Sequence, residues 1–249
     1  MIDISNYHPE KNLLADRVVL VTGAGDGIGR TAARTYAEYG ARVILLGRTI
    51  AKLEQVHDEI ESLGLAQPGI YPLDLQGATH DHYLEMAAVL ENEYGRLDGL
   101  LHNASILGDR LPLEHYNPDT WLQVMQINLH GPFLMTKALL PLLRQSADAS
   151  VIFTSSGVGQ KPRANWGAYS VSKYALEAVS LIFSQELEMT SAVRVNALNP
   201  GATRTRMRAS AFPAENPSTL KTAEDIMPLY LYLMGPDSRD IHGQSLNAQ

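Results

Sequence analysis

Tyr169 and Lys173 are the two residues whose types and spacing most directly predict acid–base chemistry. They stand four residues apart in a stretch with helical character, so both side chains are expected on one helix face. The phenol of a free tyrosine has a pKa of about 10 and is a poor acid or base at neutral pH. A nearby ammonium lowers that pKa, so the pair could exchange a proton with a carbonyl or an alcohol. Alone, this spacing is more typical of two surface neighbours, so other motifs must support the interpretation.

A glycine-rich turn, TGAGDGIG at Thr22–Gly29, follows a predicted strand and opens a predicted helix. Glycines permit a tight turn and let the backbone approach a pyrophosphate, while the helix N-terminus offers unpaired N–H groups. This context predicts a dinucleotide site whose cofactor-binding residues are Gly23, Asp26, Gly27, Ile28 and Gly29. The spacing is T-G-x-x-x-G-x-G rather than G-x-G-x-x-G, and a glycine turn that binds nothing is the alternative.

The end of the second predicted strand indicates which dinucleotide fits. An acidic residue there would bind the ribose 2′-hydroxyl of NAD(H), but the chain reads Gly47-Arg48-Thr49 and has no acid until Glu54. The glycine leaves room for a 2′-phosphate and Arg48 could pair with it, so we expect NADP(H) to be preferred over NAD(H). Arg48 could instead be a solvated charge at a strand end, and Asp26 would bring a negative charge near that phosphate.

Short apolar runs alternate with longer amphipathic stretches along the chain. The runs predict strands at Arg17–Val21, Arg42–Leu46, Gly69–Leu73, Leu97–Leu101, Ser150–Thr154, Ala192–Ala197 and Gln244–Asn247. The stretches predict helices at Gly27–Tyr39, Ala51–Leu63, His82–Tyr94, Asn117–Arg144, Gly167–Met189 and Asp225–Met234. In the longest of them, Pro132 and Pro141 are expected bend sites. This alternation is typical of βαβ units, hence of an α/β fold with a parallel sheet covered on both faces. With 249 residues and no linker, we expect a single domain over residues 1–249.

Polar motifs follow three of these strands and are expected at the carboxyl edge of the sheet, where open α/β sheets bind ligands. They are Asn103-Ala104, Ser155-Ser156 and Asn199-Pro200-Gly201. With the glycine turn, Asp74-Leu75, Asn128 and the Tyr169/Lys173 pair, they make the sequence resemble the short-chain dehydrogenase/reductase family from about Leu14 to Asn247. RANWGAYSVSK, TRTRMRASAFP and DIMPLYLYLMG make it similar to a bacterial subgroup of poorly characterised NADP-dependent oxidoreductases. The resemblance implies a Rossmann-type, doubly wound parallel sheet of about seven strands.

The resemblance also implies a role for each matching residue. Tyr169 would be the central acid/base, and Lys173 would lower its pKa and hold the nicotinamide ribose. Ser156 would hydrogen-bond the substrate carbonyl and stabilise the developing oxyanion, and Asn128 would hold a water in a proton relay with Lys173. Further cofactor contacts are implied for Asp74, Leu75, Asn103, Ala104, Pro200, Gly201, Thr203 and Thr205.

The implied function is hydride transfer between NADP(H) and a carbonyl or secondary alcohol of a small molecule. A fold is better determined by resemblance than a function is, so a non-catalytic NADP(H)-binding redox sensor or interaction protein is the alternative. The two long predicted helices resemble those of the family's usual oligomer interface, which implies a homodimer or homotetramer.

Two features depart from the family pattern or vary within it. The usual N-N-A-G reads His102-Asn103-Ala104-Ser105, and a serine there would cost stability if its backbone needed a positive φ. The irregular segment Arg204–Thr222 is expected to form a substrate-binding loop or lid over residues 203–222. Its basic residues Arg204, Arg206 and Arg208 could hold an anionic substrate group, although a solvated basic loop is slightly favoured.

Composition excludes several other classes of chemistry and partner. The chain has no cysteine, which excludes disulfides, thiolate metal sites and a cysteine nucleophile, and we predict no metal site. Lys plus Arg is 20 and Asp plus Glu is 27, so the net charge of −7 argues against nucleic acid as a partner. Met1–Asp16 is polar and no apolar stretch is long enough for a membrane span, so a cytoplasmic protein is expected.

Overall fold

The computed structural model describes residues 7–249, and residues 1–6 of the expected domain and polar N-terminus lie outside the described part. Seven strands form one sheet in the order β3-β2-β1-β4-β5-β6-β7, and every neighbouring pair is parallel. The strands are β1 (Val18–Thr22), β2 (Arg42–Gly47), β3 (Gly69–Pro72), β4 (Gly99–His102), β5 (Ser150–Thr154), β6 (Arg194–Asn199) and β7 (Ser245–Asn247). The doubly wound parallel sheet expected from the sequence is confirmed.

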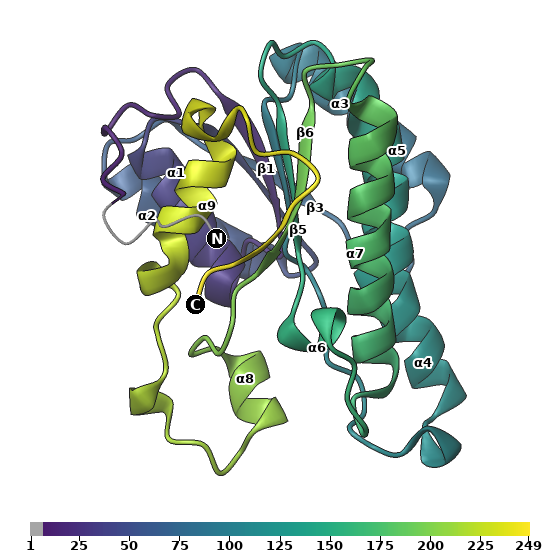
Figure 1. The fold of residues 1–249 in the computed structure, drawn as a ribbon. Coiled ribbons are helices and arrows are strands. Elements are labelled where there is room, and N and C mark those ends of the chain that lie inside the picture. Colours follow the sequence, from purple (N-terminus) through teal and green to yellow (C-terminus); the bar gives the residue numbers. More distant parts are fainter. Residues whose placement is uncertain (1–6) are drawn as a thin grey trace.

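Helices cover both faces of this sheet (Figure 1). One layer contains α1 (Gly27–Glu38), α2 (Ile50–Ser62) and α9 (Met227–Met234). The other contains α3 (His80–Tyr94), α4 (Pro118–Met125), α5 (Gly131–Leu143) and α7 (Gly167–Leu187). Two short helices, α6 (Gly157–Gln160) and α8 (Arg206–Ala211), lie at the carboxyl edge of the strands.

Strand β1 illustrates why both faces of the sheet are apolar. All five of its residues are buried, and successive side chains of a strand point to opposite faces. Val18 and Leu20 therefore belong to the core beneath α3, α5 and α7, whereas Val19 and Val21 belong to the core beneath α1, α2 and α9. A strand covered on both faces has no polar alternation, which is the pattern that predicts a parallel sheet.

The strand order reverses at β1 and β4, and this reversal opens the site. The connection after β1 leads to α1 on one side of the sheet, whereas the chain after β4 leads toward the other layer. The two connections diverge at the carboxyl ends of neighbouring strands and leave a crevice between them. The glycine turn follows β1 and Asn103 follows β4, so both lie at this crevice.

The helix expected over Asn117–Arg144 is instead three segments. A π-helical turn, Gln126–His130, separates α4 from α5. Pro132 has no N–H to donate to the carbonyl of Asn128, as an uninterrupted α-helix would require. The N–H of Gly131 donates instead to the carbonyl of Gln126, five residues back. The helix is therefore interrupted next to Pro132, one of the two expected bend sites, whereas Pro141 lies within α5.

The segment Arg204–Thr222 is also more ordered than expected. It contains α8, whose N-cap is Thr205, and a short 3-10 turn at Pro217–Thr219. A β-bridge between Thr203 and Lys221 closes the base of the segment. Among the residues that the structure describes, no helix is both long and apolar enough to cross a lipid bilayer.

Candidate active site

A cleft of about 450 Å³ lies at the carboxyl edge of the sheet and brings most of the predicted site residues together. Asn128 and Gly29 do not line it. The predicted residues that line it are Gly23, Asp26, Gly27, Ile28, Arg48, Asp74, Leu75, Asn103, Ala104, Ser156, Tyr169, Lys173, Pro200, Gly201, Thr203 and Thr205. These residues come from the segments that follow six strands, β1 to β6, so the topology of the sheet is what gathers them.

The glycine turn packs so closely on the chain after β4 that side chains would not fit. Gly23 has a φ of +67°, and a Cβ on it would lie 3.0 Å from the Cα of Ala104. A Cβ on Gly29 would collide with the carbonyl oxygen of Gly23, which explains why Gly29 lies beneath the cleft and not at its wall. The hydroxyl of Thr22 accepts hydrogen bonds from the N–H groups of Asn103 and Ala104, at 2.9 and 3.0 Å. These close contacts and hydrogen bonds fix the turn against the chain after β4.

Tyr169, Lys173 and Ser156 meet in the middle of the cleft. Lys173 is buried, its Nζ donates to the carbonyl of Thr154 at 2.6 Å, and it lies 5.8 Å from the centre of the Tyr169 ring. Burial raises the pKa of Tyr169, and a hydrogen bond with the Ser156 hydroxyl opposes that rise. Burial lowers the pKa of Lys173 to about 8, against the attraction of Glu177, which raises it. The phenol is therefore protonated at neutral pH, and the ammonium lies near its titration point.

Asn128 lies behind this group and holds the chain after β4. Its Oδ1 accepts from the N–H of Ile106, and its Nδ2 donates to the carbonyl of Ile106, both at 2.9 Å. The same Nδ2 lies 3.2 Å from the hydroxyl of Ser172 on α7. The side chain thus links the π-helical turn, the chain after β4 and α7. Its part in a water relay with Lys173 stays a prediction.

The departures after β4 do not strain the backbone. Among residues 7–249, the residues other than glycine with positive φ are Asp16 and Asn165, so the conformational cost considered for Ser105 does not arise. His102 stacks on Phe153 at 4.8 Å, and its Nε2 lies 2.8 Å from the hydroxyl of Thr136. Burial lowers the pKa of His102 to about 3, so it is a neutral core residue.

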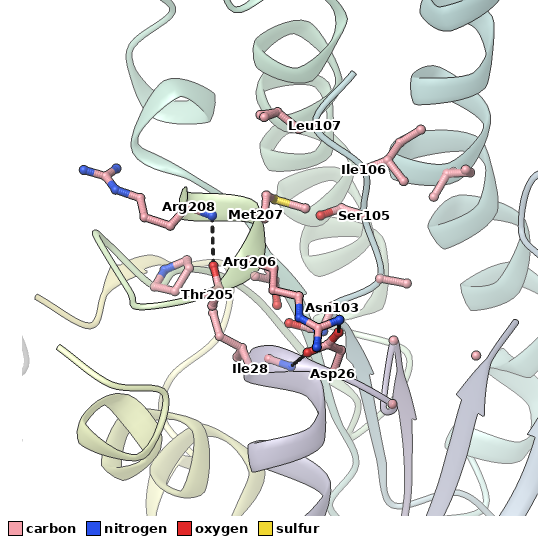
Figure 2. A pocket seen from close by; sticks show the side chains of 18 of the residues that line it. Asp26, Ile28, Asn103, Ser105, Ile106, Leu107, Thr205, Arg206, Met207 and Arg208 are labelled. Atoms are coloured by element: carbon pink, nitrogen blue, oxygen red, sulfur yellow. Dashed lines mark hydrogen bonds and ion pairs between the residues drawn. The ribbon is translucent and has the colours of Figure 1, made fainter. Parts of the chain in front are cut away.

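Basic side chains gather where the adenosine end of a dinucleotide would lie. Arg48 is exposed at the cleft wall, and Lys52 on α2 also lines the cleft. Lys52 Nζ donates to Asp26 at 2.7 Å, and Arg206 lies 3.3 Å from the same carboxylate (Figure 2). These partners, Lys52 above all, lower the pKa of Asp26 and offset its charge. Sequence reasoning missed Lys52, although its place in the first turn of the helix after β2 was a usable signal.

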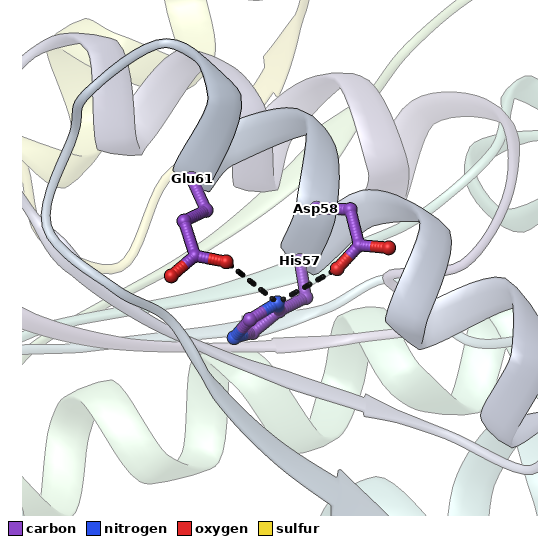
Figure 3. Close-up of side chains that lie close together, drawn as sticks. All are labelled: His57, Asp58 and Glu61. Atoms are coloured by element: carbon purple, nitrogen blue, oxygen red, sulfur yellow. Dashed lines mark hydrogen bonds and ion pairs between the residues drawn. The ribbon is translucent and has the colours of Figure 1, made fainter.

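A second group of titratable side chains lies outside the cleft. His57, Asp58 and Glu61 lie together on α2, with His57 Nδ1 3.2 Å from Asp58 and 4.0 Å from Glu61 (Figure 3). Both carboxylates are exposed, and the imidazole already partners them. Another pair of histidines, His80 and His82, lies in the first turn of α3, where His82 Nδ1 accepts from the backbone N–H of Thr79.

Comparison with known proteins decides the family. A family model described as short chain dehydrogenase matches residues 17–216. The chain belongs to the short-chain dehydrogenase family. It is 52% identical over 244 residues to the uncharacterized oxidoreductase YciK of Escherichia coli, covering 98% of this chain and 96% of that protein. The resemblance expected from the sequence is confirmed, and the protein is an oxidoreductase of this family.

Solved structures of close relatives share the whole fold. A short chain dehydrogenase from Pseudomonas syringae is 58% identical and superimposes with a TM-score of 0.96, covering 98% of this chain and 99% of that one. A relative from Shigella flexneri, solved as a complex with NADP, is 53% identical with a TM-score of 0.93. That match covers 96% of this chain and all of the Shigella chain (100%).

Proposed function

We propose that this oxidoreductase transfers a hydride between NADP(H) and the carbonyl or secondary-alcohol carbon of a small molecule, with Tyr169 moving the proton. The observation that carries the proposal is the meeting of Tyr169, Lys173 and Ser156 in the same cleft as the glycine turn. A bound nicotinamide supplies or accepts the hydride. The protein's own residues must then orient the substrate oxygen and exchange its proton.

Each of the three central side chains has a distinct task in this proposal. Because burial raises its pKa, Tyr169 holds its proton at neutral pH and can donate it to a carbonyl that becomes an alkoxide. The Ser156 hydroxyl, which lies beside the phenol, orients the same substrate oxygen. Lys173, fixed by the carbonyl of Thr154, stabilises the phenolate left after the proton has moved.

The cradle for the cofactor fits a phosphorylated dinucleotide. Gly23 and Gly27 keep the turn free of side chains, and the N-terminus of α1 faces the same cleft. Arg48 and Lys52 supply positive charge at the end where a 2′-phosphate would lie, and the NADP complex of the Shigella relative supports the same assignment. We therefore propose that NADP(H) is preferred over NAD(H).

Replacing Arg48 by alanine tests that preference. Loss of a charged hydrogen bond to the 2′-phosphate should weaken NADPH binding by about 10- to 100-fold, with little change for NADH. Titration of each dinucleotide against protein fluorescence measures both affinities. Arg30→Ala is the matched control, because Arg30 pairs with Glu59 on the exposed surface and does not line the cleft. Equal losses for NADPH and NADH in Arg48→Ala would contradict the assignment.

A carbonyl screen tests the proposed activity itself. Aldehydes and ketones of varied size are offered with NADPH, and absorbance reports its oxidation. Turnover of at least one compound class is expected. Tight NADPH binding with no oxidation across a broad panel would contradict the enzymatic proposal and support a cofactor-binding sensor.

The oligomeric state and location also stay proposals. Helix α7 exposes the largely apolar side chains of Val171, Tyr174, Leu181 and Ile182. Exposed Phe133 of α5 adjoins them, because the centre of its ring lies 6.1 Å from that of Phe183 of α7. An apolar surface of this kind is typical of contact with another chain, and we propose a homodimer or homotetramer through it. The cytoplasmic location expected from the sequence likewise stays a prediction.

A charged pair on this surface should separate the subunits. Tyr174→Glu combined with Ile182→Glu would place four negative charges in a two-fold contact, so sedimentation is expected to shift from oligomer to monomer. Leu63→Glu is the control, since Leu63 is equally exposed in the opposite helix layer. A wild-type monomer at micromolar concentration would refute the interface.

A further inference from the structure

The half of the cleft beyond Tyr169 is lined almost wholly by apolar side chains. Two follow β4, one precedes α7 and three belong to α8 or follow it: Ile106, Leu107, Trp166, Met207, Ala211 and Phe212. Figure 2 shows Met207 turned from α8 toward Ser105, across the cleft. The polar groups at this end are the hydroxyls of Ser105, Ser156 and Tyr169 and the guanidinium of Arg208, which lies over the ring of Phe212 at 3.9 Å and is paired with Glu215. The three hydroxyls are the groups left to hydrogen-bond a ligand, and they lie where its reacting oxygen would be.

Aromatic rings form a continuous wall at this end. Trp166 is buried, and its ring lies 5.9 Å from that of Tyr169 and 5.7 Å from that of Phe212. Arg110 covers Trp166 at 4.3 Å and donates to the backbone carbonyl of Ala211. Arg110 does not itself line the cleft, so it holds the wall and α8 together from behind. The wall is therefore held in place by contacts within the protein itself.

The arginines of the segment 203–222 are occupied by other partners. Arg204 donates to the carbonyls of Pro217 and Leu220, and Arg206 pairs with Asp26. Arg208 donates to both oxygens of Glu215, at 2.6 and 2.5 Å, and extends away from Arg206 in Figure 2. An anionic substrate group would have to displace a carboxylate from Arg206 or Arg208, and Arg204 does not line the cleft.

Burying a charge without a partner costs far more than burying an apolar group. Among residues 7–249, no unpaired cation lines the apolar half of the cleft, so a carboxylate on the substrate would lose water without gaining an ion pair. Aromatic and alkyl groups would instead gain contact with Trp166, Met207 and Phe212. The paired arginines and the apolar lining of the cleft thus both favour an uncharged ligand with an apolar group.

We propose that the substrate is an uncharged carbonyl compound, or the matching alcohol, whose group next to the reacting carbon is aromatic or alkyl. This inference rests on the proposed NADP(H)-dependent activity, because it places the reacting oxygen at Tyr169 and Ser156. The apolar group lies against the wall formed by Trp166 and Phe212, beside Met207 and Leu107.

Two aldehydes of similar size and opposite character test this proposal. 4-Isopropylbenzaldehyde is neutral and apolar at the ring position where 4-carboxybenzaldehyde carries a carboxylate. We expect kcat/KM with NADPH to be about 10-fold or more higher for the isopropyl compound. Equal or higher kcat/KM for the carboxylate would overturn the substrate class while leaving the proposed activity intact.

A charge placed in the apolar wall should reverse the order. Met207→Lys puts an ammonium beside the bound ring, so 4-carboxybenzaldehyde becomes the better substrate of the two. Met207→Leu keeps the wall apolar and is expected to keep the preference for the isopropyl compound. An unchanged preference in Met207→Lys would show that the ring does not bind beside α8.

A binding measurement without turnover tests the proposed substrate class independently of the enzymatic activity. The chain has two tryptophans, Trp121 and Trp166, so Trp166 alone reports in the Trp121→Phe background. In that background, with Tyr169→Phe and saturating NADP⁺, the isopropyl aldehyde should change the emission at lower concentration than the carboxylate. If neither aldehyde is reduced, this measurement alone decides the substrate class. A response to the carboxylate at equal or lower concentration, or to neither compound, would refute it.

Discussion

Replacing Tyr169 by phenylalanine is expected to lower kcat by about 10³-fold, the size of effect typical of a general acid, while NADPH binds as before. The substitution removes one hydroxyl and keeps the ring that packs on Trp166. The substrate oxygen then has Ser156 as a hydrogen-bonding partner but no group that can deliver the proton. Steady-state kinetics and NADPH titration measure the two effects separately.

Tyr174→Phe is the matched control for this loss. Tyr174 lies on the same helix, more than half exposed, and does not line the cleft. Loss of its hydroxyl should leave kcat within about two-fold, as is usual for surface substitutions. Substantial turnover in Tyr169→Phe would refute the proposed role of the phenol, even if the protein proves to be a reductase.

Lys173→Met is expected to lower kcat about 10²- to 10³-fold, because the phenolate formed by proton transfer loses its neighbouring charge. The pH dependence of kcat in the wild type tests the same role of Lys173. Burial lowers the pKa of Lys173 to about 8, so reduction should decline above about pH 8 as the ammonium loses its proton. A profile that stays level to pH 10 would contradict this role.

Glu177→Gln should move the alkaline limb of that profile in a known direction. The Glu177 carboxylate raises the pKa of Lys173, so its removal lowers that pKa and shifts the limb to lower pH. Glu177 does not line the cleft, and the substitution keeps the shape of the side chain. A merely structural role for Lys173 would leave the limb where it is.

The pH dependence of protein stability also tests the lowered pKa of Lys173. The folded-state pKa of Lys173, about 8, lies below the ordinary value of 10.5, so the unfolded chain binds the proton more tightly. The free energy of unfolding of the wild type should therefore rise between about pH 8 and 10.5, relative to Lys173→Met, by about 3 kcal/mol. Urea unfolding of both proteins at pH 7 and pH 10.5 measures this difference.

The sequence was sufficient for the architecture because each strand carries its own signal. An apolar run without alternation, such as that of β5, is uncommon outside a sheet covered on both faces, and its bounds at Ser150–Thr154 agree with the prediction. The predicted secondary structure differs from the observed one where the backbone hydrogen bonding is local and irregular. A bend was expected at Pro132, but the sequence did not indicate that it would take the form of a π-helical turn, and α8 formed within a segment rich in proline and polar residues.

The candidate site was also largely predictable, since its residues follow strand ends and parallel strands share their carboxyl edge. What could not be predicted is how the charges pair. Lys52 meets Asp26 across 26 residues, and Arg110 reaches Ala211 across 101, contacts that no local pattern encodes. The same holds for Asn128, whose amide is bonded to the backbone of Ile106.

The sequence by itself thus determined the family, the parallel sheet and the identity of the residues beside the cleft. Strand hydrophobicity and glycine spacing are local properties, so they can be recognised in the sequence without the tertiary structure. Only the tertiary structure decided which charges are free. It pairs Arg208 with Glu215 and Arg206 with Asp26, and it makes an apolar wall of Trp166 and Phe212 beside Tyr169. Arg206 and Asp26, like Trp166 and Phe212, come from segments far apart in sequence that only the folded chain brings into contact.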